Sequence, residues 1–369
     1  MSLKHIDEYR DAELSRSLLD KIRRTSRTPV RLMEVCGTHT VSIFRSGIRS
    51  ILPETISLLS GPGCPVCVTD QSEIDAFIQT TGIEDGIVAT FGDLMRVPGT
   101  RSSLLKERAE GRDIRMVYST MDAVEIARKN PDRQVVFLGI GFETTAPTIA
   151  AAILAAKQQG LKNFSVYSAH KLVPPALEAL MTLCETKIDG FILPGHVSVI
   201  IGLNGYRDFF DRHRIPGVVA GFESADLLQA IAMLVEQIET RRPALENAYS
   251  RAVSATGNLT AQKVLRDAFE TADVAWRGLG VIPGSGLKIR EALADFDAQR
   301  RFDLHVPAAR EPQGCACGEI LTGNKIPPQC ALFRKVCTPI DPVGPCMVST
   351  EGTCAAYYKY HPDRARSHS

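Results

Sequence analysis

Short apolar runs alternate with amphipathic stretches from residue 29 to about residue 242, and this alternation is the strongest constraint on the fold. Such a pattern is typical of βαβ units in a parallel sheet. We therefore predict an α/β protein with two tandem Rossmann-like parallel lobes. The predicted strands are 30–35, 56–60, 87–91 and 114–118 in the first lobe, and 135–140, 164–168, 190–193 and 217–220 in the second.

The strand pattern stops after Arg241-Arg242-Pro243, where a smaller and less regular unit is expected. Helices are predicted there at 244–255 and 261–272, followed by a Gly-rich stretch and the cysteine segment. The predicted units are an N-terminal helix packing on a later domain (1–29), the first lobe (30–120), the second lobe (121–242) and an irregular, helical and loop-rich cysteine (Fe-S) domain (243–369).

The charge balance excludes some function classes. Lys and Arg number 43 against 42 Asp and Glu, which gives a formal net charge of +1. Binding to nucleic acid normally requires a clustered basic excess, so no nucleic-acid partner is expected. The longest apolar runs are too short to span a bilayer. With no secretory segment recognised, the chain is predicted to be cytoplasmic and to have no membrane partner.

Six of the ten cysteines lie between residues 315 and 360. Disulfides, zinc or an iron–sulfur cluster would each explain them, but a reducing cytosol disfavours disulfides. Zinc sites usually contain C-x2-4-C pairs, and the only close pair here, Cys315-x-Cys317, is too tight. A four-iron cluster is favoured, with zinc and reduced structural cysteines as alternatives. Cys317, Cys330, Cys337 and Cys354 are separated by 12, 6 and 16 residues, and Cys315 and Cys346 stand outside this series.

Reactive side chains follow most of the predicted strands. Because ligands of open parallel α/β sheets bind at the carboxyl ends of the strands, these side chains are expected to line a cleft between the lobes. The expected cleft holds three thiols, two or three imidazoles and three carboxylates. The residues at the strand ends are Cys36, Thr38, His39, Thr40, Cys64, Cys67, Asp93, Glu143, His170, His196 and Glu223.

Each of these residues also has a structural interpretation. Cys36 taken alone is more often a small buried hydrophobe, whereas its place at a helix start favours a thiolate. Cys64-x-x-Cys67 indicates a dithiol/disulfide pair or half of a metal site. His170 and His196 are each as well explained as structural histidines, with the proposed cleft favouring His196. Cys184 lies in a helical apolar pattern and is expected in the core.

Six motifs together resemble the HypD family of [NiFe]-hydrogenase maturation proteins. They are MEVCGTHT (33–40), SGPGCPVCV (60–68), FGDLMRVPGT (91–100), GFETTAPT (141–148), PGHVSVIIG (194–202) and the cysteine series above. The resemblance runs from about residue 30 to 360, and it implies a scaffold with redox activity for building the Fe(CN)2CO unit of the hydrogenase active site. It also implies two partners, a small HypC-type chaperone and a HypE-type protein that delivers cyanide.

The resemblance assigns roles to individual residues. Cys36 would ligate the iron that carries cyanide and carbon monoxide, together with a cysteine of the chaperone. Cys64 and Cys67 would be the redox pair, and His196 and Glu351 match functionally important positions. Thr38, His39 and Thr40 are our candidates for holding the cyanide ligands. The implied ligands of a [4Fe–4S] cluster are Cys317, Cys330, Cys337 and Cys354.

Two other functions stay open on the sequence. One is an Fe-S-dependent thiol-disulfide oxidoreductase that acts on a protein substrate, which would not need Cys36. The other is a binding module whose zinc or cluster is only structural. For the assembly function, Cys315 or Cys346 is a candidate relay between the cluster and the Cys64/Cys67 pair, since a C-x-x-C pair stores two electrons.

Overall fold

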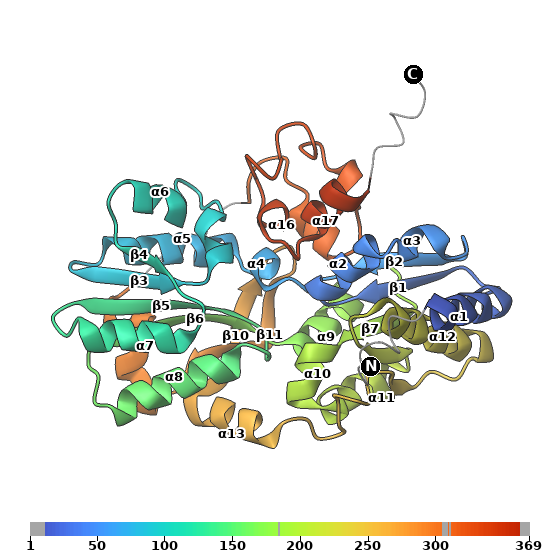
Figure 1. Ribbon diagram of the computed structural model, residues 1–369, viewed down its shortest axis with the longest axis horizontal. Coiled ribbons are helices and arrows are strands. Elements are labelled where there is room, and N and C mark those ends of the chain that lie inside the picture. Colours follow the sequence, from blue (N-terminus) through green and yellow to red (C-terminus); the bar gives the residue numbers. More distant parts are fainter. Residues whose placement is uncertain (1–11, 184, 305–308, 310, 362–369) are drawn as a thin grey trace.

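The computed structural model describes residues 12–183, 185–304, 309 and 311–361, so Cys184 lies outside the described residues. All eight predicted strands are present and lie in two sheets with helices between them, which confirms the α/β prediction. Figure 1 shows the two sheets side by side, with the cysteine segment above the junction between them.

The first sheet is entirely parallel. Its central strands β1 and β7 are almost completely buried, as expected for strands covered on both faces. In spatial order its strands are β2 (Ile56–Ser60), β1 (Val30–Glu34), β7 (Gly190–Pro194), β8 (Gly217–Ala220) and β9 (Leu245–Asn247).

The second sheet is mixed, since four parallel strands continue into an antiparallel hairpin. The hairpin strands β10 and β11 pair with each other, and β11 joins the sheet through β6. In spatial order its strands are β10 (Phe269–Trp276), β11 (Gly280–Ile289), β6 (Phe164–Lys171), β5 (Gln134–Gly141), β3 (Gly86–Thr90) and β4 (Ile114–Met116).

The sheets do not divide the chain at residue 120 as predicted. Strands β3 and β4 join the second sheet, and β7 and β8 return to the first. The chain therefore passes between the sheets after β2, after β6 and after β9. Apolar periodicity identifies buried strands, but it carries no information on which strands become neighbours, because every central parallel strand has the same pattern.

The prediction that strands end after residue 243 is also wrong. Residues 245–247 form β9, and β10 and β11 follow helix α13 (Leu259–Ala268), which ends four residues before the predicted helix does. The hairpin turn contains Gly278 and Gly280, both with positive φ (77° and 72°). Glycine adopts this conformation at little cost, so the Gly-rich stretch was a hairpin signal.

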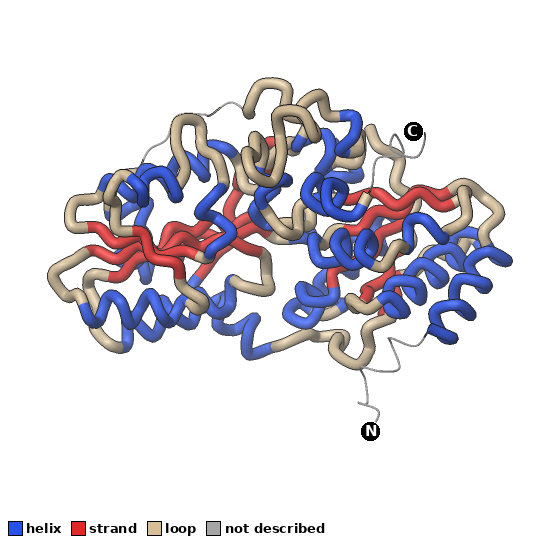
Figure 2. The backbone as a smooth tube through the Cα atoms, turned by 45° about the horizontal axis from the view of Figure 1, so that its top comes forward, coloured by secondary structure: helices blue, strands red, loops and turns tan. Residues whose placement is uncertain are grey.

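Helices cover the outer faces of both sheets, as the tube in Figure 2 shows. The longer helices are α1 (Ala12–Thr25), α2 (Gly37–Arg45), α5 (Gln71–Gln79), α7 (Thr120–Lys129), α8 (Ala146–Gln158), α9 (Val173–Leu183) and α12 (Ser224–Thr240). The shorter ones are α3 (Ile48–Ile51), α4 (Pro65–Val68), α6 (Leu104–Ala109), α10 (Gly195–Ile201), α11 (Arg207–His213) and α14 (Ala298–Arg301), together with 3-10 turns η2 (Thr80–Gly82), η3 (Gly92–Arg96), η4 (Leu203–Tyr206) and η5 (Glu291–Phe296).

The cysteine segment has little regular structure. It consists of α15 (Cys317–Leu321), η6 (Pro327–Gln329), α16 (Pro345–Val348) and α17 (Thr353–Tyr360), joined by loops. Helix α17 packs on α2, where the rings of Phe44 and Tyr357 lie 4.5 Å apart. Helices α15 and α16 both contact α4, which follows β2. The segment is therefore anchored on α2 and α4, the helices that follow the carboxyl ends of β1 and β2.

One continuous core joins both sheets to the cysteine segment. It contains Met33 from β1, Leu138 from β5 and Cys317 from α15 in a single cluster of buried side chains. Separate clusters lie under the outer helices, including one in which Leu18 and Ile22 of α1 pack with α12. The shared core holds the parts that surround the site in a fixed arrangement.

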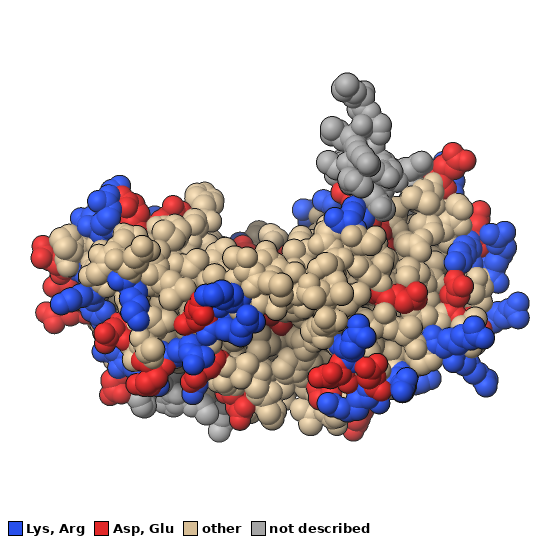
Figure 3. Space-filling model, turned by 90° about the horizontal axis from the view of Figure 1, so that it is seen from below, with Lys and Arg blue, Asp and Glu red and all other residues tan. Residues whose placement is uncertain are grey.

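The surface in Figure 3 carries basic and acidic side chains interspersed, with no broad field of one sign on the face that it shows. Among the described helices, none combines the length and the apolar character required to cross a membrane.

Candidate functional site: a cleft at the strand ends and a cysteine pocket

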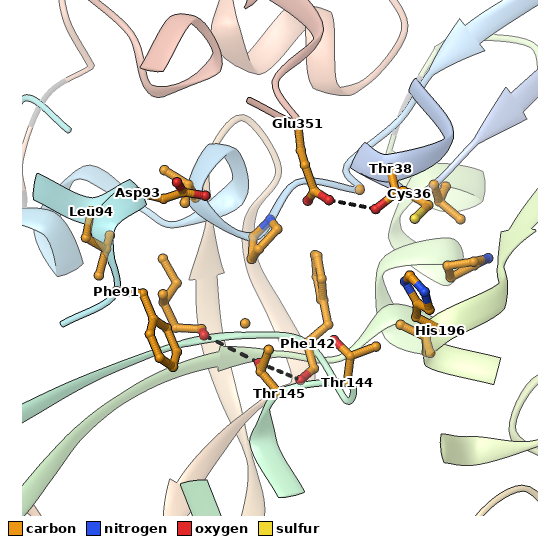
Figure 4. Close-up of a pocket in the computed structure, with 18 residues that line it drawn as sticks. Cys36, Thr38, Phe91, Asp93, Leu94, Phe142, Thr144, Thr145, His196 and Glu351 are labelled. Atoms are coloured by element: carbon orange, nitrogen blue, oxygen red, sulfur yellow. Dashed lines mark hydrogen bonds between the residues drawn. The ribbon is translucent and has the colours of Figure 1, made fainter. Parts of the chain in front are cut away.

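A cleft of about 270 Å³ lies between the two sheets, where the carboxyl ends of β1, β2, β3, β5 and β7 meet. Figure 4 shows Cys36, Thr38 and His196 on one side of the cavity, with Phe91 and Leu94 opposite them. Glu351 enters from the cysteine segment. The expected convergence of strand ends from both sheets is therefore present, although the strands belong to different sheets than predicted.

Cys36 immediately precedes α2, two residues after the end of β1, and it is 9% exposed at the cleft. Burial raises the pKa of its thiol to about 12, while the backbone amides of His39 and Thr38 lower it by a smaller amount. The helix start thus favours a thiolate as predicted, but desolvation outweighs it. At neutral pH the Cys36 side chain is therefore the protonated thiol.

Glu34, two residues before Cys36, supports the backbone of Cys36 and was not singled out from the sequence. Its carboxylate accepts hydrogen bonds from the Cys36 amide (3.1 Å) and the Thr40 hydroxyl (2.5 Å). Burial raises its pKa to about 8, against the lowering effect of these bonds. A glutamate between the apolar residues Met33 and Val35 of a predicted strand was the available signal, since buried carboxyls require partners.

Glu351 and Thr38 close one side of the cleft. The Thr38 hydroxyl donates a hydrogen bond of 2.6 Å to Glu351, drawn as a dashed line in Figure 4. Burial raises the pKa of Glu351, and the nearby charge of Asp93 adds to that effect. Gly37 permits this approach, because a Cβ there would lie 2.6 Å from the Glu351 Cβ. Glu351, which lies 313 positions after Thr38 in the sequence, thus completes the site around Cys36.

His196 follows β7 and presents its ring to the cleft. The ring stacks on Phe222, with centroids 3.9 Å apart and planes 25° apart. Desolvation lowers the pKa of His196, which keeps the ring neutral at pH 7. Phe222 was not predicted as part of the site; it comes from the loop after β8 and fixes the orientation of the imidazole.

His39 and Thr40 lie outside the cleft, contrary to the expectation for the GTHT motif. His39 is fully buried, and its Nε2 is 2.9 Å from the Gly221 carbonyl oxygen. Thr40 points toward Glu34 and the carbonyl of Cys36. Successive residues of a helix point in different directions, so only Thr38 of this set reaches the cleft.

Three other strand-end residues do not line the cleft either. Glu143 is buried, and its carboxylate accepts a hydrogen bond from the Val173 amide (3.0 Å). His170 is buried beside the Ser168 hydroxyl (2.9 Å), and Glu223 caps α12. Within the described residues, the cleft therefore has one imidazole, His196, and two carboxylates, Asp93 and Glu351, where more of both were expected.

Cys64 and Cys67 are joined by a disulfide at the start of α4. Their side chains are 3% and 0% exposed, so the sulfur atoms lie behind the cleft wall that Pro65 and Val66 form. The loop leans closely on Cys36, because a Cβ at Gly63 would be 2.2 Å from the Cys36 nitrogen. The loop that precedes the disulfide is consequently packed against the backbone of Cys36.

All six cysteines of the C-terminal segment line one small pocket with apolar walls. Its cavity is about 10 Å³, which is roughly the space of one water. The sulfur atoms of Cys317 and Cys346 are 2.9 Å apart. The structure thus places Cys315 and Cys346, set apart by their spacing, beside the other four. The walls are Ile320, Leu332, Phe333 and Met347.

The donor chemistry of this pocket fits an iron–sulfur cluster. Thiolates in an apolar, water-poor pocket are the usual ligands of such clusters. In the described part of the chain, no three Cys, His, Asp or Glu side chains converge tightly enough to hold a single metal ion. Six thiols around a bulkier centre remain compatible with that finding, because cluster ligands bind different iron atoms.

The fold and these two sites define a class: α/β proteins with a thiol at an inter-sheet cleft, a buried C-x-x-C disulfide behind it and a cysteine-lined pocket above. A family model described as "Hydrogenase formation hypA family", HypD, matches residues 13–361. The chain therefore belongs to the HypD family, and its role lies in hydrogenase maturation.

Similar proteins cover nearly the whole chain. "Hydrogenase maturation factor HypD2" of Bradyrhizobium diazoefficiens is 48% identical, over 99% of this chain and 98% of its own length. "Hydrogenase maturation factor HypD" of Rhodobacter capsulatus is 46% identical, over 98% of this chain and all of its own. The protein of the same name in Escherichia coli is 43% identical, over 97% and 98%.

Proposed function

We propose that this chain is the scaffold on which the Fe(CN)2CO unit of [NiFe]-hydrogenase is assembled, with Cys36 as the thiolate that holds the iron. One observation carries the proposal: of the cysteines in the described residues, Cys36 alone lines the cleft between the sheets. Iron with cyanide and carbon monoxide ligands favours soft thiolate donors. The iron is cargo here, so its ligand must be reachable.

The cyanide ligands need hydrogen-bond donors near Cys36. Thr38 lines the cleft and places a hydroxyl beside Glu351, whereas His39 and Thr40 point away from it. We therefore assign the donor role to the first backbone amides of α2, which have no partners within the helix, and to Thr38, whose single hydroxyl proton would turn from Glu351 to the cyanide nitrogen. His196, on the same side as Cys36, would face the bound cargo with a neutral ring.

A second thiolate would come from a partner. A small HypC-type chaperone would contribute a cysteine to the same iron, so that the metal bridges the two proteins. A HypE-type protein would deliver cyanide as a thiocyanate. Release of cyanide from a thiocyanate consumes two electrons, R–SCN + 2e⁻ → RS⁻ + CN⁻, and oxidation of the Cys64 and Cys67 thiols to the disulfide provides two.

The disulfide would be reduced again from the cysteine pocket. We assign Cys317, Cys330, Cys337 and Cys354 as ligands of a [4Fe–4S] cluster, which supplies electrons one at a time when bound. The chain supports this assignment in two ways: helix α4 contacts α15 and α16, and apolar side chains surround the thiols. Exclusion of water by Leu332, Phe333 and Met347 would protect the centre.

A thiol-disulfide oxidoreductase is the second candidate, and the Cys64–Cys67 disulfide itself favours it. A protein substrate would have to reach a sulfur atom for thiol exchange, which depends on access. Both sulfur-bearing residues are buried, with Cys67 fully so. The assembly function requires only that electrons and a small ligand reach the cleft, and it agrees better with this burial.

Infrared spectroscopy of the chain purified with its small partner tests the proposal. The wild type should show cyanide and carbon monoxide stretches, and Cys36→Ala should lose them. Cys36→Ser keeps the size of the side chain but not the soft sulfur, and it should lose them as well. Bands that persist in both variants would refute the scaffold role of Cys36. Reduction of an external disulfide that survives Cys36→Ala would favour the oxidoreductase.

A further inference from the structure

Three consecutive residues at the end of β10 connect three parts of the molecule: the cleft, the helix α4 that contains Cys67, and the cysteine segment. The Trp276 ring lies 6.0 Å from the ring of Phe142, which lines the cleft. The Arg277 backbone amide donates a hydrogen bond (2.9 Å) to the carbonyl of Val68 in α4, the helix that contains Cys67. Gly278 abuts Gly318 beside the cysteine pocket, since a Cβ at Gly278 would be 2.3 Å from the Gly318 Cα.

Arg277 is the charged residue of this junction, and its side chain is fully buried. Its Nε donates to the Thr69 carbonyl (3.1 Å), two residues after Cys67, and Nη2 donates to the Gln71 side chain (3.3 Å). Guanidinium groups stay protonated in proteins. A permanent positive charge is thus fixed between the disulfide and the cysteine pocket.

The charge of Arg277 is only partly balanced. Its ion-pair partner is Glu311, whose side chain is 41% exposed and therefore screened by solvent. Toward the pocket there is less screening by solvent, because Ala316 and Cys317 are buried. Gly278, the residue after Arg277, packs directly on Gly318, the residue after Cys317, so the backbone at Arg277 lies beside the pocket wall.

We propose that Arg277 sets the reduction potential of the redox centre in the cysteine pocket, acting as a fixed counter-charge for the electron that the centre accepts. The inference rests on the proposed function, in which a cluster occupies that pocket. One-electron reduction adds one negative charge without a proton, and a nearby cation in a low-dielectric interior stabilises the reduced form. Arg277 thereby raises the reduction potential of the centre, and the negative charge of Glu311 lowers it.

The sign of the effect distinguishes this role from a purely structural one. A residue that only caps the Val68 and Thr69 carbonyls would change stability, and its partner Glu311 would not change the potential. A counter-charge predicts opposite shifts: removing the cation lowers the potential, and removing the anion that balances it raises the potential. Arg277→Lys keeps the charge and should stay near the wild type.

The test uses the full chain, loaded anaerobically with iron and sulfide, in a redox titration followed by electron paramagnetic resonance. At a fixed potential, Arg277→Gln should lower the reduced-to-oxidised ratio about tenfold, which corresponds to about 59 mV for one electron. Glu311→Gln should raise the ratio several-fold. Glu291→Gln, which removes an equally negative but exposed side chain paired with Arg300, is the matched control and should change nothing.

Glu311→Gln alters an exposed side chain and keeps the proposal testable even where Arg277→Gln fails to fold. Shifts of both variants in the same direction, or potentials equal to the wild type in both, overturn the role of Arg277 and leave the assembly proposal intact. A wild-type chain that takes up no redox-active cluster overturns both, and iron and sulfide analysis of the loaded protein shows which has failed.

Discussion

The cleft and the cysteine pocket present cysteine sulfur in opposite surroundings. The cleft has a volume of about 270 Å³, one thiol and several polar side chains, and it opens at the strand ends. The pocket has about 10 Å³, six thiols and apolar walls. Thiolates are suitable ligands for soft metals, so under the proposed function access would decide what each site does. A cleft suits cargo that enters and leaves, and a closed pocket suits a resident centre.

The two sites also differ in how they are held. Cys36 sits between elements that are distant in sequence, since Gly63 presses on its backbone and Glu351 covers the first turn of its helix. The pocket is built almost wholly from one segment, and it rests on α4 and α2. The cleft therefore depends on the tertiary fold, whereas the pocket depends mainly on the local packing of one segment.

The largest expected effect concerns the pocket. Cys354→Ser should remove most of the bound iron and sulfide, because it deletes one of the four proposed ligands. Cys315→Ser, the matched control within the same pocket, should keep the cluster. Metal and sulfide analysis after anaerobic loading measures both. Equal loss of iron and sulfide in the two variants would show that Cys315 is also a ligand. Cys315 is the strongest alternative ligand, because it contacts Cys317, which in turn contacts Cys346.

The next effect concerns the packing around Cys36. Gly63→Ala should reduce the free energy of unfolding by about 3 kcal/mol, because a Cβ at 2.2 Å from the Cys36 nitrogen forces the disulfide loop away. Gly82→Ala is the matched control, since no heavy atom lies within 4 Å of a Cβ there. Denaturant unfolding compares the two. A Gly63→Ala protein as stable as Gly82→Ala would show that the loop is free to move.

A pH effect comes from Glu143, a buried carboxyl between the cleft-lining residues Phe142 and Thr144. Burial raises the pKa of Glu143 to about 7. The folded state thus holds this proton more tightly than the unfolded state, whose pKa is 4.5. The contribution of Glu143 to the free energy of unfolding is fully present below pH 4.5. It is lost as the pH rises through 7, and the loss is up to about 3 kcal/mol.

Glu143→Gln should remove that loss, so that its unfolding free energy changes less than that of the wild type between pH 5 and pH 8. Denaturant titrations at several pH values measure the difference. Glu125→Gln, at an exposed carboxylate on α7, is the control and should follow the wild type over this range. A wild type with the same stability at both pH values would show that Glu143 is solvated or paired in solution.

The sequence predicted the strands well and their grouping poorly. Each strand is a local apolar run, so 30–35 or 135–140 could be recognised alone, whereas the exchange of β3, β4, β7 and β8 between sheets depends on long-range pairing. Cys36, His196 and Glu351 were found through their motifs. Glu34, Phe222 and Arg277 were missed, because each acts through a neighbour that only the fold brings close.

The smallest effect tests the contact between the two sites. Thr38→Val deletes the 2.6 Å hydrogen bond to Glu351, which joins α2 to the cysteine segment. The unfolding free energy should fall by about 1 kcal/mol, and Thr38→Ser, which keeps the hydroxyl, should restore most of it. Hydrogen exchange at the amides of 349–354 should rise in Thr38→Val only. Unchanged exchange in this stretch would mean that Glu351 is held by its own segment, and that the cleft and the pocket are mechanically independent.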